Sequence, residues 1–198
     1  MLRKLRRKVR AIPRKGKEPY FSFYKMLGFY PDRIELYHEA LTHRSSSVKS
    51  KEGKWVNNER LEFLGDAILD AIVADILYKK FIHKKEGFLT STRSRIVQRE
   101  TLNKIAVEIG IDSIITTSTR NLSHNTNIYG DALEALIGAI YLDQGYRVAK
   151  HFVYETLIKE HINIENVVKS EVDFKSRLIE WGQKHKIDSF LHLQNYHY

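Results

Sequence analysis

The sequence predicts an all-α protein, because apolar residues recur at the helical period along most of the chain and alternating strand patterns are scarce before residue 185. Its 198 residues are 42% hydrophobic and 29% charged, an ordinary mixture for a globular protein. The absence of cysteine excludes disulfides, thiolate nucleophiles and iron–sulfur clusters. The longest apolar stretch, 67–78, contains two aspartates, so no membrane-spanning segment is expected.

The first two expected helices flank a polar loop. A start signal at Pro31-Asp32 precedes helically spaced apolar residues over 32–43. The stretch 44–54 contains serines and Gly53 and is expected to form an exposed loop. Asn57 or Asn58 can then cap a long helix that runs to about Phe81.

Three more helices are expected after a turn at 83–87. Thr90 or Ser91 can cap one that continues to near Gly110, and the polar run 116–127 is expected as another loop. Helices at about 128–143 and 146–160 follow, separated by a break at Gln144-Gly145.

Most of the net charge of +9 lies in the first 18 residues, which contain nine Lys/Arg and a single acid, Glu18. A basic arm of this kind can neutralise phosphates and bind nucleic acid independently of sequence. Two alternatives are a solvated tail that aids solubility and an organellar transit peptide, although the arm lacks serine and contains Pro13.

The most informative stretch is the acidic start of the long helix. At about 100° per residue, Glu59, Glu62 and Asp66 fall within an arc of about 60° on one helix face, and Asp70 extends the stripe. A second acidic pair, Asp131 and Glu134, lies on one face of the helix expected at 128–143. Carboxylates on largely apolar helices are costly unless cations neutralise them.

Two such helices packed together would form an oxygen-rich site that suits Mg²⁺ or Mn²⁺. The alternative for either acidic pair alone is that first-turn acids are favoured by the helix dipole. Both pairs together with Asp66 and Asp70 make that alternative weak, but spacing alone neither identifies the substrate nor excludes Asp70 from the site.

The stretch Asn58-Glu59-Arg60-Leu61-Glu62-Phe63-Leu64-Gly65-Asp66-Ala67 resembles the signature of the ribonuclease III family at every position. Three further stretches, at 40–45, 86–90 and 130–135, resemble other sequence blocks of that family and occur in the expected order. The resemblance covers roughly residues 20–165. It implies an all-helical, dimeric endonuclease domain that cleaves double-stranded RNA with Mg²⁺, for which Mn²⁺ can substitute, leaving 5′-phosphate and 3′-hydroxyl ends in RNA processing and decay.

Position by position, the resemblance assigns the metal site to four carboxylates: Glu62, Asp66, Asp131 and Glu134. Asp66 and Glu134 are implied to be the residues most critical for catalysis. Glu59 and Glu86 match further acidic positions of the cleavage site, whereas Asp70 matches no essential family position. The family acts as a homodimer, and the helix that carries the signature is expected to form the dimer face, with Gly65 permitting close approach.

The resemblance also divides the chain into parts. A basic N-terminal arm at 1–19 is followed by the catalytic domain at 20–165 and a linker at 166–170. Residues 171–198 resemble the beginning of a double-stranded-RNA-binding domain, and 28 residues are too few for the whole module. A cytoplasmic protein is expected, because the basic N-terminus is not followed by the apolar region of a secretory signal.

Three arginines that follow Glu86, namely Arg93, Arg95 and Arg99, are candidate phosphate contacts, and a solvated basic face is an equally good interpretation. His43 is interpreted as a hydrogen-bonded structural histidine. Two other functions remain open. One is a non-catalytic double-stranded-RNA-binding or ribosome-associated protein of the same fold. The other is a metal-dependent phosphohydrolase that acts on small nucleotides, a class that usually includes histidines among its ligands.

Overall fold

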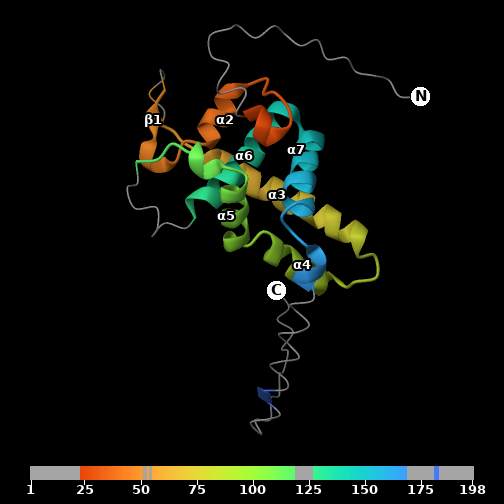
Figure 1. The fold of residues 1–198 in the computed structure, drawn as a ribbon. Coiled ribbons are helices and arrows are strands. Elements are labelled where there is room, and N and C mark those ends of the chain that lie inside the picture. Colours follow the sequence, from red (N-terminus) through yellow and green to blue (C-terminus); the bar gives the residue numbers. More distant parts are fainter. Residues whose placement is uncertain (1–22, 51–52, 54, 119–126, 169–180, 183–198) are drawn as a thin grey trace, which may run out of the picture.

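The structure is a computed structural model, and it describes residues 23–50, 53, 55–118, 127–168 and 181–182 (Figure 1). The basic arm expected at 1–19 lies outside the described residues, as does nearly all of 171–198. The α-helices of the described residues include α2 (Ile34–Ala40), α3 (Glu59–Lys80), α4 (Glu86–Ile96), α5 (Arg99–Glu108), α6 (Ile128–Gln144) and α7 (Tyr146–Phe152). The predicted all-α fold is therefore confirmed.

Helix α6 is the centre of the fold. Ten of its 17 residues are buried, among them Leu133, Leu136 and Ile140, so it is apolar on nearly every side. Such a helix is stable only when neighbours cover it on all sides. Helices α2, α3, α5 and α7 pack around it (Figure 1), and α3 makes the most extensive contact.

Two glycines allow α3 and α6 to cross at very close range. A Cβ atom added to Gly65 would lie 1.7 Å from the carbonyl oxygen of Glu134, and one added to Gly138 would lie 2.4 Å from that of Leu61. The expectation that Gly65 permits close approach at a dimer face is therefore wrong. Gly65 faces α6 of the same chain, and only a residue without a side chain fits at this position.

The end of α6 holds the start of α2. The Asp143 carboxylate accepts hydrogen bonds from the backbone N–H groups of Asp32 and Arg33, at 3.1 and 2.9 Å, and from the Tyr37 hydroxyl at 2.9 Å. Asp32 and the N-cap residue Arg33 come directly before the first residue of α2, Ile34. Asp143 therefore anchors the segment that leads into α2 to the end of α6.

The single helix expected from residue 90 to 110 is wrong. The chain forms α4 and α5 instead, and the backbone of Gln98 is extended between them, with φ −63° and ψ 148°. Helix α4 also begins at Glu86 rather than after Thr90, whose hydroxyl donates to the Glu86 carboxylate. The helix expected over 146–160 is α-helical only to Phe152 and continues as a π-helix over Val153–Lys159.

The loop expected at 44–54 contains more structure than predicted. A 3₁₀ turn at Arg44–Ser46 leads into an antiparallel hairpin of β1 (Val48–Lys49) and β2 (Trp55–Val56), which projects from the body beside α2 (Figure 1). A second 3₁₀ turn lies at Ile111–Ser113. Among the helices that the structure describes, none has the length and apolar character needed to cross a membrane.

Candidate metal centre

Carboxylates from α3 and α6 meet where the two helices cross. Glu62 lies in the first turn of α3, and Asp131 and Glu134 lie near the start of α6. Their carboxylate oxygens lie within 4.8 Å of one another. The crossing at Gly65 brings them together, because it presses α3 against the backbone of Glu134 itself.

These side chains line a polar pocket of about 600 Å³. Asp66, one turn beyond Glu62 on α3, lines the same pocket but is exposed, and it does not belong to the group within 4.8 Å. The remaining walls come from α3, the start of α5 and the segments that precede α3 and α6: His43, Arg44, Asn58, Glu59, Phe63, Arg99 and Asn127.

The pocket disfavours negative charge on its own carboxylates. Burial, followed by repulsion from Asp66, Glu62 and Asp131, raises the pKa of Glu134 to about 8. Burial also raises the pKa of Glu62 and of Asp131, and Asp131 adds repulsion at Glu62. Partial desolvation and the Asp70 charge raise the pKa of Asp66. All four pKa shifts have the direction expected of carboxylates that are partly withdrawn from water, and repulsion from neighbouring carboxylates adds to the shifts of Glu134, Glu62 and Asp66.

The donor set fits a hard divalent cation. Several carboxylate oxygens at one point, with no thiolate or imidazole among the three grouped residues, are the ligands that Mg²⁺ and Mn²⁺ prefer. The buried Nδ2 of Asn58, which lines the pocket, has no hydrogen-bond partner among the described residues. A buried donor without a partner is costly, so it fits a pocket whose occupant brings acceptor oxygens.

We expect the metal-free protein to lose stability as the pH rises from about 4.5 to 8. The folded state binds the Glu134 proton up to a pKa of about 8, whereas the unfolded chain releases it near the ordinary value of 4.5. The native state therefore binds more protons than the unfolded state in this window, and the free energy of unfolding falls as pH rises. Urea titrations in EDTA at several pH values measure this slope.

Saturating Mg²⁺ should flatten or reverse the slope, because the ion binds the deprotonated carboxylates. A free energy of unfolding in EDTA that stays constant across the window would contradict the prediction.

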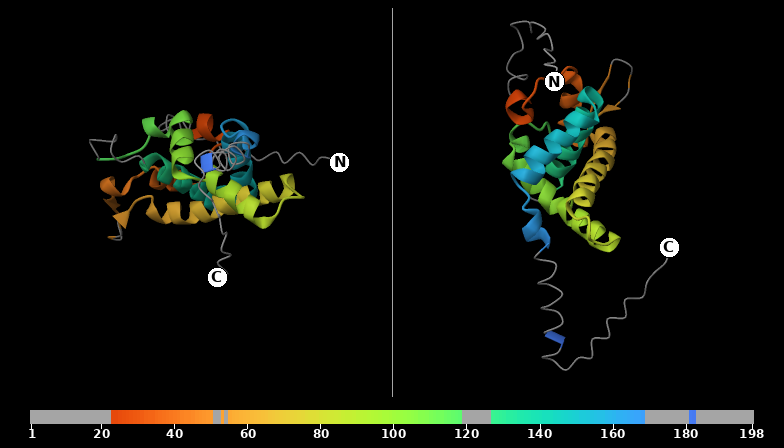
Figure 2. Two further views of the ribbon diagram at one scale, coloured as in Figure 1. Left: turned by 90° about the horizontal axis from the view of Figure 1, so that it is seen from below. Right: turned by 90° about the vertical axis from the view of Figure 1, so that its right-hand side faces the viewer.

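The two additional acidic positions lie at opposite ends of α3. Glu59 lines the pocket, and its carboxylate lies 3.8 Å from the Arg44 guanidinium. Glu86 begins α4, beyond the far end of the 22-residue α3, which is about 33 Å long. Both views in Figure 2 show α4 at the end of α3 opposite the hairpin. Within one chain, the structure does not bring Glu86 to the pocket.

The three candidate arginines have different surroundings. Arg93 lies 3.9 Å from the Asp70 carboxylate on α3, and Arg95 donates to the carbonyl oxygen of Val167 at 2.9 Å. Only the third of them, Arg99, lines the carboxylate pocket, where its charge lowers the pKa of Glu62, Asp131 and Glu134 against the effect of burial.

His43 has the structural role expected of it. Its Nδ1 accepts a hydrogen bond from the Ser45 backbone N–H at 3.2 Å and caps the 3₁₀ turn. Burial and then the Arg44 charge lower the pKa of His43, which favours the neutral ring. Sequence reasoning missed Arg44, Asn58 and Asn127 as walls of the pocket. Arg44 and Asn58 lie inside motif blocks that were noticed, but a motif does not show which side chains face inward.

A larger cavity, of about 860 Å³, lies between α3 and the π-helix that follows α7. Lys79 and Lys150 line it, and both pair with Asp75, which also faces it. These two lysines therefore share one acid, and among the described residues the group of carboxylates that could hold a metal ion lies in the other pocket.

The fold and the site together define a class: a helical protein in which two central helices bring together carboxylates that could hold a metal ion. A family described as ribonuclease-III-like matches residues 33–161, and the chain belongs to that family.

Curated relatives and solved structures agree with this family. The chain is 58% identical to the protein named Ribonuclease 3 of Bacteroides thetaiotaomicron and 56% identical to that of Phocaeicola vulgatus, each over 95% of this chain. It spans only 60% and 61% of the length of these relatives. The nuclease domain of ribonuclease III from Campylobacter jejuni superimposes with a TM-score of 0.62 at 36% identity, over 70% of this chain and 93% of that chain.

Proposed function

We propose that this protein is a ribonuclease III that cleaves double-stranded RNA endonucleolytically, leaving 5′-phosphate and 3′-hydroxyl ends. The observation that carries the proposal is the convergence of Glu62, Asp131 and Glu134 at the crossing of α3 and α6. Relatives named Ribonuclease 3 at 56–58% identity support the choice of RNA as substrate. The reaction is proposed to serve RNA processing and decay in the cytoplasm.

Four carboxylates are proposed to hold Mg²⁺, which Mn²⁺ can replace: Glu62, Asp66, Asp131 and Glu134. A bound divalent ion supplies the positive charge that offsets both the crowded carboxylates and the scissile phosphate. Asp66 and Glu134 are proposed as the most critical residues. Asp66 lines the pocket and is exposed, so its carboxylate is accessible to an incoming phosphodiester. Arg44 and Arg99 add fixed positive charge to the same walls and orient the phosphate.

The function is tested by offering radiolabelled duplex RNA, single-stranded RNA and duplex DNA of the same sequence in Mg²⁺. Cleavage is expected of duplex RNA alone, because its shape and 2′-hydroxyl groups distinguish it from the other two. The products should carry 5′-phosphates, which phosphatase and ligase treatment reveals. Binding without cleavage would favour a non-catalytic RNA-binding protein, and cleavage of mononucleotides would favour a small-molecule phosphohydrolase.

A homodimer is proposed, with two sites that face opposite strands of one duplex. Phe63 is 82% exposed on α3. It lies beside an apolar cavity of about 680 Å³ lined in part by Leu36, Leu64 and Leu142. A solved structure of the Campylobacter jejuni nuclease domain describes a region involved in dimer formation. Because Glu86 lies far from the pocket of its own chain, we propose that it reaches the pocket of the second copy.

Replacing Phe63 with alanine is expected to weaken the dimer by at least about tenfold in dissociation constant, since burying a phenylalanine side chain contributes about 1.5–3 kcal/mol. Sedimentation equilibrium of the wild type and the variant measures the change. Tyr146→Ala is the matched control, because Tyr146 is a 39% exposed aromatic residue at the start of α7 and does not lie on α3. Equal dissociation constants for wild type and Phe63→Ala would contradict the proposed interface.

The parts of the chain outside the body are proposed to assist binding. The arm at 1–19 is proposed to contact the phosphate backbone through its basic residues. Residues 171–198 are proposed as the beginning of a double-stranded-RNA-binding domain, joined to the catalytic domain at 20–165 by the linker at 166–170.

A further inference from the structure

The hairpin of β1 and β2 presents an exposed tryptophan next to the carboxylate pocket. Trp55 is 66% exposed and Val48 is 58% exposed. The two strands pair Lys49 with Trp55 and Val48 with Val56. A large aromatic side chain exposed to water on a two-stranded hairpin contributes little to the core, so its position suits the binding of a partner.

The charge of the hairpin indicates an anionic partner. Residues 48–56 contain three lysines and one glutamate. The Lys49 ammonium lies 5.1 Å from the centroid of the Trp55 ring, a cation–π arrangement that keeps positive charge beside the aromatic surface. Aromatic rings interleaved with lysines are typical of surfaces that bind unpaired nucleotides, where the ring stacks on a base and the cations contact phosphates.

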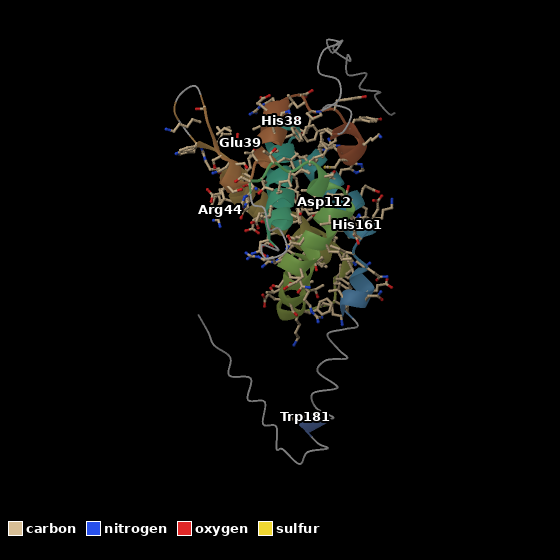
Figure 3. The ribbon with its side chains drawn as sticks, turned by 60° about the vertical axis from the view of Figure 1, so that its left-hand side comes forward. His38, Glu39, Arg44, Asp112, His161 and Trp181 are labelled. Carbon is tan, nitrogen blue, oxygen red and sulfur yellow. The ribbon has the colours of Figure 1, made fainter. Side chains whose placement is uncertain are left out.

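Hydrogen bonds and an ion pair connect the base of the hairpin to the wall of the pocket. Asn57 Nδ2 donates to Ser47 Oγ at 3.0 Å, and Asn57 Oδ1 accepts from the Glu59 backbone N–H at 3.1 Å. Arg44, at the base of the hairpin (Figure 3), pairs with Glu59 in the pocket wall. Since Trp55 precedes Glu59 by only four residues, their Cα atoms lie within about 14 Å of each other. An RNA strand held in the pocket therefore passes within reach of the hairpin.

We propose that this hairpin binds the RNA strand beside the cleavage site, with Trp55 stacking on an unpaired base. The inference rests on the proposed function and adds a preference among its substrates. In an uninterrupted duplex each base is already stacked between its neighbours, so Trp55 has no free base to cover. A bulged nucleotide next to the cleavage site offers its face, and the enzyme binds such a duplex more tightly than a fully paired one.

The test compares a fully paired RNA duplex with a series of duplexes that each carry one bulged nucleotide. The bulge is placed at successive positions within a few base pairs of the cleavage site. With the best bulged duplex, Trp55→Ala is expected to raise KM by about 5- to 100-fold and leave kcat unchanged, which corresponds to the loss of one stacked base. Trp55→Phe should restore most of the affinity, because it retains an aromatic face. Tyr78→Ala, on an exposed aromatic outside the hairpin, should match the wild type.

A direct binding measurement separates this inference from the proposed function. The chain contains two tryptophans, so Trp181→Phe leaves Trp55 as the single tryptophan probe. The bulged duplex should quench Trp55 fluorescence more strongly than the paired duplex, even in a preparation that does not cleave RNA. Absence of cleavage by the wild type would overturn the nuclease function. Equal quenching by both duplexes, or equal KM values for Trp55→Ala and wild type on the bulged duplex, would overturn the role of the hairpin.

Discussion

Replacing Glu134 with glutamine is expected to abolish cleavage of duplex RNA while leaving the protein folded. Glu134 belongs to the group of three carboxylates within 4.8 Å, and glutamine keeps its shape but removes its charge. Mutation of residues that only support metal ligands typically lowers metal affinity or activity by about 10- to 100-fold. Loss of a ligand itself should therefore lower kcat/KM by at least about 100-fold. Single-turnover cleavage in Mg²⁺, with RNA binding measured separately by filter retention, checks this result.

The same substitution should stabilise the metal-free protein at pH 8. The pKa of Glu134 is about 8, so as the pH rises to this value and beyond, an increasing fraction of its carboxylate is charged. This buried charge repels Asp66, Glu62 and Asp131. Glutamine removes this repulsion, so the variant should unfold at a higher urea concentration than the wild type in EDTA.

The matched control is Glu35→Gln, because the Glu35 side chain is 71% exposed and lies outside the pocket. The control should behave as the wild type in both assays. Unchanged cleavage by Glu134→Gln would show that the ion is held elsewhere.

Replacing Gly65 with alanine is expected to destabilise the protein by about 3 kcal/mol or more. The added Cβ would lie 1.7 Å from the backbone oxygen of Glu134 and 2.9 Å from the backbone nitrogen of Gly138. Backbone atoms cannot rotate away as a side chain can, so α3 and α6 must separate, and overpacking of this kind costs about 1–3 kcal/mol or more. Thermal and urea denaturation followed by circular dichroism measure the loss.

Gly87→Ala provides the opposite control. Gly87 also lies in a helix, α4, and an added Cβ there meets nothing within 4 Å. Alanine should therefore stabilise the protein, by up to about 1 kcal/mol, through its higher helix propensity. A Gly65→Ala variant as stable as the wild type would show that the two helices are not held at the distance described.

The long helices were predictable from sequence because many turns repeat the same apolar pattern. The periodicity after Asn58 predicted a helix to about Phe81, and α3 ends at Lys80. The division between α4 and α5 was not predictable in this way, since neither glycine nor proline marks it and the apolar spacing continues across Gln98. The hairpin was missed because strands of two residues are too short to show alternation.

The candidate site was predictable one helix at a time. Spacing placed Glu62 and Asp66 on one face of α3 and Asp131 and Glu134 on one face of α6, but it could not show how close the two faces come. That distance depends on the crossing at Gly65, which is a tertiary contact. For the same reason, sequence could not show that Asp70 pairs with Arg93 while Asp66 lines the pocket.

The hydrogen bonds of Asp143 link the last turn of α6 to the beginning of α2. This residue lies in the last turn of the same helix whose first turns carry Asp131 and Glu134. The Asp143 carboxylate accepts four hydrogen bonds, and three of them come from Asp32, Arg33 and Tyr37. Opening the beginning of α2 would break these three together, so fraying there is coupled to the last turn of the central helix. The rate of amide hydrogen exchange at Asp32 and Arg33 therefore reports on the stability of the helix that carries Asp131 and Glu134.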